Sequence, residues 1–318
     1  MPFIEYIKQN FHPGSRAIIA NANTIIDDWM AQGYKLTLRQ IYYRFIALDL
    51  LPASWIDAEY NKRHHLAPTT KNTIKNYKKL GEILNAARLG GKVDWDAMED
   101  RTRSLMSVQH WNTPEEAVKW VANQYRKQKW DSQKTRVEVW IEKDALLGIF
   151  EDVCNRSTVD VPFFSCRGYN SQSEMWAASQ RVLYYERKGI RTVILQFSDH
   201  DPSGIDMTND IKKRLTMFGC HAVVKRLALT IKQVRRFKLP PNPAKETDCR
   251  FEKYSKKYGN ESWELDALEP SMLAALVTNA VTAVRNKYQW DKDTKTEALE
   301  IKKLKAVKFG RQRKKAKR

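Results

Sequence analysis

Apolar residues recur at helical spacing through the first third of the chain. In the run LRQIYYRFIALDLL they follow the i, i+3, i+4, i+7 spacing of a buried helix face, at Leu38, Ile41, Tyr42, Phe45 and Leu48. Thr37 precedes this run and is a suitable N-cap residue. Similar patterns predict helices over residues 18–30 and 77–89, and the N-cap, proline and capping-box glutamate in residues 113–116 predict another over residues 114–130. Short helices with basic residues between them are typical of helix-turn-helix DNA-binding modules, so residues 1–130 are expected to form a helical, winged-helix-like domain.

From residue 136 the pattern changes to β-rich apolar runs with helical segments between them. Strands are predicted over residues 136–141, 161–166, 192–197 and 221–229. This alternation indicates parallel βαβ units. We therefore expect a mixed α/β protein, in which residues 131–300 form a domain with a mostly parallel sheet flanked by helices. Ligands of such sheets bind beyond the carboxyl ends of the strands.

The chain is strongly basic, with a formal net charge of +19. Because basic side chains release condensed counterions when they contact phosphates, this excess predicts a polyanionic partner, double-stranded DNA, with RNA as an alternative. Residues 301–318 form a tail without an acidic side chain. We expect this tail to bind the DNA backbone without sequence preference, unless it is only a solubilising end, through Arg311, Arg313, Lys314 and Lys315.

Other features of the sequence argue against a membrane or secreted protein. There is no apolar run of about 18 residues, and residues 1–10 carry charged side chains where a signal peptide has an apolar core. The four cysteines lie far apart, without the spacing of a zinc site. We therefore expect a soluble, intracellular protein with reduced thiols.

Three acidic residues follow predicted strands. Glu142 comes directly after the first strand, and Asp199 and Asp201 come after the third, in the sequence FSDHDPSG. Residues two apart in an extended segment point the same way, and Glu142 faces them if the two strands are neighbours. Three carboxylates without a softer ligand favour Mg²⁺, or Mn²⁺, over zinc. The alternatives are that these acids are solvated loop residues, or that Glu142 is a general acid or base.

These acids resemble the metal site of the Toprim domain found in topoisomerases, primases and some nucleases. Residues 166–169 (CRGY) are similar to the G-K-G-Y segment after the second Toprim strand, with Cys and Arg replacing Gly and Lys. Residues 37–43 (TLRQIYY) resemble the T-x-R-D-I-Y-Y motif of a winged-helix domain, with Gln40 in place of Asp. Together these motifs resemble the A subunit of topoisomerase VI and the meiotic double-strand-break proteins. The chain looks like a stand-alone relative of phage or mobile-element type.

The resemblance implies that Tyr43, the second tyrosine of the pair, attacks phosphorus and leaves a covalent 5′-phosphotyrosyl bond. Periodicity agrees, because Tyr42 lies on the apolar stripe whereas Tyr43 lies off it and is expected to project toward DNA. Arg39 lies four residues earlier on the same helix, so its guanidinium can reach the Tyr43 oxygen or the scissile phosphate. Lys143 and Arg167 are further candidates for contacts with phosphate, and the alternative for Lys143 is an ordinary solvated lysine.

In this family the tyrosine and the metal come from different protomers, which implies a homodimer that cuts both DNA strands. No G-x-x-x-x-G-K-[ST] loop is found, so full topoisomerase activity would need a separate ATPase subunit. The implied location is the cytoplasm, at the nucleoid or on phage DNA.

Two alternatives to this function stay open. One is a Toprim nuclease in which metal-activated water hydrolyses DNA and Tyr43 only positions it. The other is a non-catalytic DNA-binding protein of the same fold. Residues 263–266 (WELD) contain further acids, and we expect them to be a structural segment that packs on the sheet.

Overall fold

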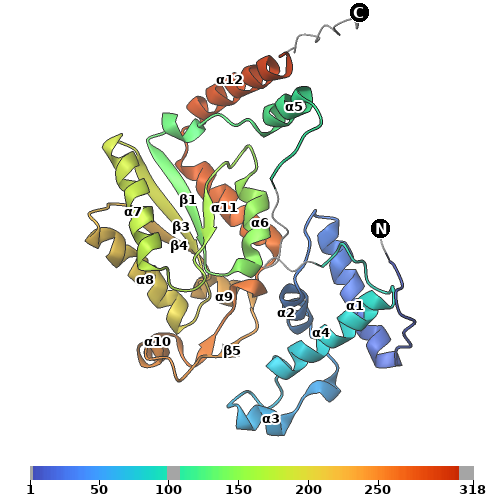
Figure 1. Ribbon diagram of the computed structural model, residues 1–318. Helices are drawn as coiled ribbons and strands as arrows, with labels where there is room; N and C mark the ends of the chain where they lie inside the picture. Colours follow the sequence, from blue (N-terminus) through green and yellow to red (C-terminus); the bar gives the residue numbers. More distant parts are fainter. Residues whose placement is uncertain (1–2, 99–107, 308–318) are drawn as a thin grey trace, which may run out of the picture.

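A four-stranded parallel sheet organises the larger part of the protein (Figure 1). The computed structural model describes residues 3–98 and 108–307. The strand order is β2-β1-β3-β4, with bounds β1 Thr135–Ile141, β2 Phe163–Ser165, β3 Arg191–Phe197 and β4 Val223–Ala228. Strands β1 and β3 pair along their whole length, and Ile141 lies opposite Phe197 at the carboxyl end. The residues that follow these two central strands therefore start side by side.

Helices cover both faces of the sheet, and the central strands are buried on both faces. Successive side chains point to opposite sides of a strand, so Val139 packs with α6 and α11 while Trp140 packs with α7 and α8. These helices are α6 Leu147–Cys154, α7 Gln172–Arg187, α8 Pro202–Met217 and α11 Pro270–Val284. The mixed α/β class with a parallel sheet, predicted from the alternating pattern, is confirmed.

The segment between β4 and α11 lies at the carboxyl ends of the strands (Figure 1). It contains a short antiparallel pair and two helices, namely α9 Ile231–Phe237, β5 Asn242–Pro243, α10 Phe251–Tyr258 and β6 Glu261–Ser262. A bridge between His200 and Trp263 ties this segment to the loop after β3, with reciprocal backbone hydrogen bonds of 2.8 and 3.0 Å. Residues 263–266 are thereby held beside the end of the sheet.

The N-terminal helices pack around a second apolar core. They are α1 Pro13–Met30, α2 Leu38–Ala47, α3 Ala58–Arg63 and α4 Ile74–Leu89. Thr37 caps α2 as predicted, and Gln40 completes a capping box by accepting a 2.8 Å hydrogen bond from the Thr37 backbone N–H. Residue 40 of the motif thus has a structural role in the helix start. Residues 3–98 form helices and isolated bridges, and no strand of a wing is found among them.

Helix α5 (Pro114–Gln124) packs against α12 (Lys287–Lys305), away from the other N-terminal helices (Figure 1). It ends before the predicted residue 130, because the chain leaves the helix to contact α12. The Tyr125 hydroxyl donates to Glu300 at 2.7 Å, and the backbone N–H of Lys127 donates to Glu297 at 2.8 Å.

In the part of the chain that the structure describes, no helix is long and apolar enough to cross a membrane. The tail residues expected to contact DNA lie outside the described residues, namely Arg311, Arg313, Lys314 and Lys315.

Candidate functional site

Glu142 joins the ends of the two central strands. Its backbone N–H donates to the Phe197 carbonyl at 2.9 Å, and its side-chain Oε2 accepts a 3.0 Å hydrogen bond from the Asp199 backbone N–H. Burial raises the pKa of the Glu142 carboxyl, and the negative charge of Asp201 adds to that rise. Glu142 and Asp199 are therefore neighbours, as predicted. One Glu142 oxygen, however, is already engaged by the backbone N–H of Asp199 in the loop after β3.

Asp201 starts helix α8. Its Oδ1 accepts a 2.6 Å hydrogen bond from the Gly204 backbone N–H, and Pro202 occupies the first helical position. The turn packs so closely that a Cβ atom on Gly204 would lie 2.3 Å from the Asp199 carbonyl oxygen. The D-x-D-P-x-G run is thus a helix start folded tightly over Asp199, and Pro202 and Gly204 lie in the first turn of the helix.

A half-buried arginine on β4 holds the backbone of this loop through several hydrogen bonds. Arg226 donates to Ser198 Oγ at 2.5 Å, to the Gly204 carbonyl at 2.7 Å and to the Asp199 carbonyl. Burial lowers its pKa to about 10, and the charges of Glu142 and Asp199 oppose that shift. Arg226 therefore stays charged at neutral pH and holds the backbone around Asp199.

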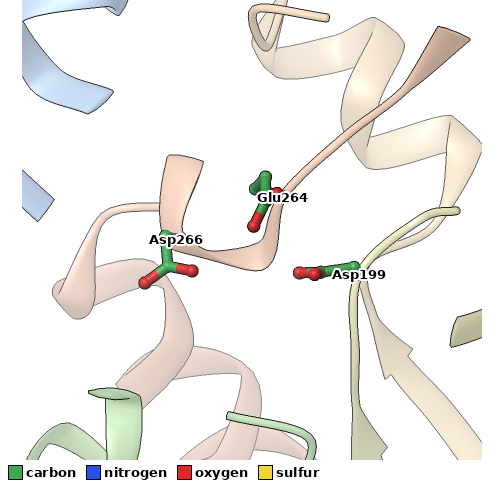
Figure 2. A group of neighbouring side chains, drawn as sticks. All are labelled: Asp199, Glu264 and Asp266. Atoms are coloured by element: carbon green, nitrogen blue, oxygen red, sulfur yellow. The ribbon is translucent and has the colours of Figure 1, made fainter. Parts of the chain in front are cut away.

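Three carboxylates converge beside this loop: Asp199, Glu264 and Asp266, here called the acidic triad (Figure 2). One oxygen of each lies within 4.8 Å of the others. The His200–Trp263 bridge aligns the two segments, and the Leu265 backbone N–H donates to Asp199 Oδ1 at 2.7 Å. Burial raises the pKa of Asp199, and the positive charge of Lys143 opposes that rise. Side chains of Glu142 and Asp201 do not join this group.

Two basic side chains contact the acidic triad. Lys143 Nζ lies 2.7 Å from Asp199 Oδ2 and 2.8 Å from Asp266 Oδ2, and it also pairs with Glu264. Arg39 Nη2 lies 3.1 Å from Glu264 Oε2. Burial alone would lower the pKa of Lys143, but Asp266, Asp199 and Glu264 together hold it well above its usual range. Lys143 is therefore an internal ion-pair partner rather than a surface contact for phosphate.

The position of Tyr43 off the apolar stripe predicts an exposed side chain. In the structure Tyr43 is instead buried, with 6% of it exposed. Tyr43 is buried because residues 242 and 264 lie over this part of α2. Asn242 Nδ2 donates a hydrogen bond to the Tyr43 oxygen at 3.4 Å. Arg39 lies 6.0 Å from the centre of the Tyr43 ring. Burial raises the Tyr43 pKa to about 12, with Glu264 adding to the rise and Arg39 opposing it.

Tyr43 lines a cavity of about 380 Å³ between the N-terminal helices and the acidic triad. Its wall includes Arg39, Asn242 and Glu264, and aromatic side chains from α2, α3 and α4, at Tyr42, Tyr60 and Tyr77. The cavity thus connects the tyrosine with one member of the triad. We call it the Tyr43 cleft.

Arg167 remains available to solvent after β2. Its side chain is 78% exposed and pairs with Asp144 Oδ2 at 2.9 Å. The loop around it contacts the end of β1, because the Gly168 backbone N–H lies 3.4 Å from the Glu142 carbonyl. Arg167 therefore lies on a loop that borders the strand ends.

The residues that sequence reasoning missed are Glu264 and Asp266. Residues 263–266 do pack on the sheet, but they also complete the triad. The available signal was their spacing, because two acids two residues apart repeat the D-x-D pattern of Asp199 and Asp201.

The donor set of the triad fits a hard divalent cation. All its side-chain donors are carboxylate oxygens, the ligand type that Mg²⁺ and Mn²⁺ prefer. Asp266 is 2% exposed, and its Oδ1 has no hydrogen-bond partner, so a ligand oxygen is left over in the buried part of the site. Comparisons with protein-family models, curated proteins and solved structures find no match for this chain.

Proposed function

We propose that the protein cleaves DNA by attack of the Tyr43 phenol on a backbone phosphate, as in the topoisomerase VI A-subunit family. The observation that carries the proposal is the position of Arg39, which lies 6.0 Å from the centre of the Tyr43 ring and pairs with Glu264 of the acidic triad at 3.1 Å. One guanidinium thus joins the two groups that the reaction needs. A Toprim domain preceded by a helical DNA-binding domain, without wing strands in residues 3–98, is part of the same proposal.

In the proposed step, the Tyr43 oxygen forms a bond to phosphorus and the bond from phosphorus to the 3′ oxygen breaks. The 3′ oxygen leaves and takes up a proton. The 5′ phosphate of the DNA then stays bonded to the Tyr43 oxygen as a 5′-phosphotyrosyl linkage. Because burial raises the Tyr43 pKa to about 12, the phenol needs a base and a cation beside it. Glu264 lines the same cleft and would accept the proton on the oxygen that does not bind the metal, while Arg39 would stabilise the phenolate and the phosphate charge.

A divalent cation, Mg²⁺ or Mn²⁺, completes the proposed site. Asp199, Glu264 and Asp266 would hold it, and the unpartnered Asp266 Oδ1 supports that assignment. Bound there, the cation would neutralise phosphate charge and stabilise the leaving oxygen. Glu142 and Asp201 stay in the proposal as groups that position Asp199, with Glu142 as a further ligand or acid–base group.

We also propose a homodimer, with a separate ATPase subunit for strand passage, on the basis of the resemblance. Within one chain the Arg39–Glu264 ion pair already ties α2 to the triad. We therefore propose that each copy carries its own tyrosine and triad, instead of sharing them between protomers. Mixing Tyr43→Phe with Asp266→Asn protein tests this: a shared site would restore cleavage in the mixture, and a site within one chain would not.

Hydrolysis by metal-activated water is the second candidate. The observation that favours it is the burial of Tyr43, since a phenol at 6% exposure with a pKa near 12 is a poor nucleophile until the cleft opens. In that case Tyr43 would position the substrate, and the triad would supply the chemistry.

One experiment separates the two candidates. Supercoiled plasmid is incubated with Mg²⁺ and wild-type protein, with Tyr43→Phe, with Asp266→Asn, or with Tyr184→Phe, an exposed tyrosine on α7 that serves as control. The proposal predicts broken DNA that stays bound to protein until proteinase digestion, and its loss in the first two variants only. Protein-free breaks that persist in Tyr43→Phe would establish hydrolysis, and no Mg²⁺-dependent breaks would contradict both.

A further inference from the structure

The acidic triad already has a cation of its own. Lys143 Nζ lies within ion-pair distance of all three carboxylates, at 2.7 Å from Asp199 and 2.8 Å from Asp266, with Glu264 as the third partner. The lysine directly follows Glu142, and the backbone there is extended, with φ of −111° and ψ of 128°. Only 17% of the Lys143 side chain is exposed. Its ammonium therefore occupies the space between the carboxylates.

We propose that Lys143 is an exchangeable internal cation, which holds the acidic triad together without metal and must leave before a divalent ion binds. The inference rests on the proposed metal-dependent function, but it concerns binding, which is measured without nucleic acid. It assigns Lys143 a role that neither a surface phosphate contact nor a solvated lysine would have.

Charge explains why a cation is needed there. Three neighbouring carboxylates out of water repel one another strongly, and an opposite charge between them offsets both the repulsion and the desolvation. With Lys143 and Arg39 as partners, the five groups formally carry one net negative charge. A divalent ion in place of the ammonium would make the cluster neutral.

Distance explains why the two cations exclude each other. Magnesium binds carboxylate oxygens at about 2.0–2.1 Å, so an ion shared by the triad would lie in the region that the Lys143 ammonium fills. If both bound there, the Lys143 ammonium and the divalent ion would be in direct contact. No carboxylate oxygen would lie between them to screen their repulsion. Metal binding therefore requires Lys143 to turn away, and the free energy of its ion pairs is subtracted from the metal affinity.

The test measures Mn²⁺ binding by the electron paramagnetic resonance signal of the free ion. Wild-type protein is compared with Lys143→Gln and with Lys129→Gln as a matched control. Lys129 is also a buried lysine between two acids, at 2.7 Å from Glu297 and 3.2 Å from Asp160. We expect Lys143→Gln to bind Mn²⁺ at least about tenfold more tightly than wild type, which corresponds to about 1.4 kcal/mol, and Lys129→Gln to match wild type. Equal or weaker binding by Lys143→Gln would overturn the proposal.

A second measurement uses the wild-type protein and decides the matter if Lys143→Gln does not fold. An amine-acylating reagent is applied with and without saturating Mn²⁺, and Lys143 modification is measured by mass spectrometry. The proposal predicts a several-fold increase in Lys143 labelling when metal is bound, with Lys129 unchanged. Unchanged or reduced labelling of Lys143 would overturn it. Metal exchange without DNA cleavage would instead contradict only the proposed function.

Discussion

Replacing Gly204 with alanine tests whether the close packing of the α8 start over Asp199 is real. The new Cβ would lie 2.3 Å from the Asp199 carbonyl oxygen, 3.0 Å from Asp201 Oδ1 and 3.2 Å from the Asp199 carbonyl carbon. The first of these atoms belongs to the backbone and also accepts a hydrogen bond from Arg226. It cannot move aside as a flexible side chain would, so the loop itself has to shift.

The expected magnitude follows from two opposing effects. Overpacking of this kind costs about 3 kcal/mol when backbone must move, and alanine recovers about 1 kcal/mol of helix propensity. We therefore predict that Gly204→Ala loses about 2 kcal/mol of unfolding free energy. Because Asp199 moves with its carbonyl, the affinity of the acidic triad for Mn²⁺ should fall as well.

Urea unfolding followed by tryptophan fluorescence measures this loss. Gly14→Ala is the matched control, since a Cβ at Gly14 in α1 would meet no atom within 4 Å. That variant should be as stable as wild type or slightly more stable. If Gly204→Ala unfolds at the wild-type urea concentration and binds Mn²⁺ normally, the packing derived for this loop is wrong.

Two further predictions concern Arg226, which donates to the Asp199 carbonyl, and His200, the residue after Asp199. Arg226→Met leaves the Asp199 carbonyl without its donor and removes one of the donors to the Gly204 carbonyl. We therefore expect a loss of about 3–5 kcal/mol in urea unfolding, whereas the exposed Arg235→Met should stay within about 0.5 kcal/mol of wild type. A wild-type-like Arg226→Met would show that the arginine does not hold the loop. Burial lowers the pKa of His200 to about 4, against about 6.5 when unfolded. Below pH 6.5 the unfolded chain therefore binds a proton that the folded chain does not, and stability should fall by up to about 3 kcal/mol as pH drops toward 4. Thermal unfolding across this range checks the prediction, and an unchanged pH slope in His200→Gln would contradict it.

The local elements were predictable because their signals lie close together in the sequence. The apolar spacing and Thr37 predict α2, and the alternation after residue 135 predicts a parallel sheet. The register of β1 and β3 then brings Glu142 and Asp199 together, as expected from the strand ends. For the helix and the strands, a short segment contains the information that decides its own structure, and the meeting of Glu142 and Asp199 follows once two such strands pair.

The composition of the site was not predictable in the same way. Glu264 and Asp266 reach Asp199 through the His200–Trp263 bridge, a tertiary contact between segments far apart in the chain. Tyr43 lies off the apolar stripe of its own helix, but periodicity within one helix does not show what other segments cover. Nothing in the sequence distinguishes Lys143 from other basic residues. Its role as an internal ion-pair partner follows only from the three acids that converge around it in the fold.

The central claim is that Tyr43 becomes covalently joined to DNA. The most direct measurement is mass spectrometry of peptides after incubation with a DNA duplex and Mg²⁺, followed by nuclease and protease digestion. We predict a nucleotide phosphate on the peptide that contains Tyr43, absent with a chelator and absent in Tyr43→Phe. Mg²⁺-dependent breaks that carry free 5′ phosphates, with Tyr43 unmodified, would contradict the account.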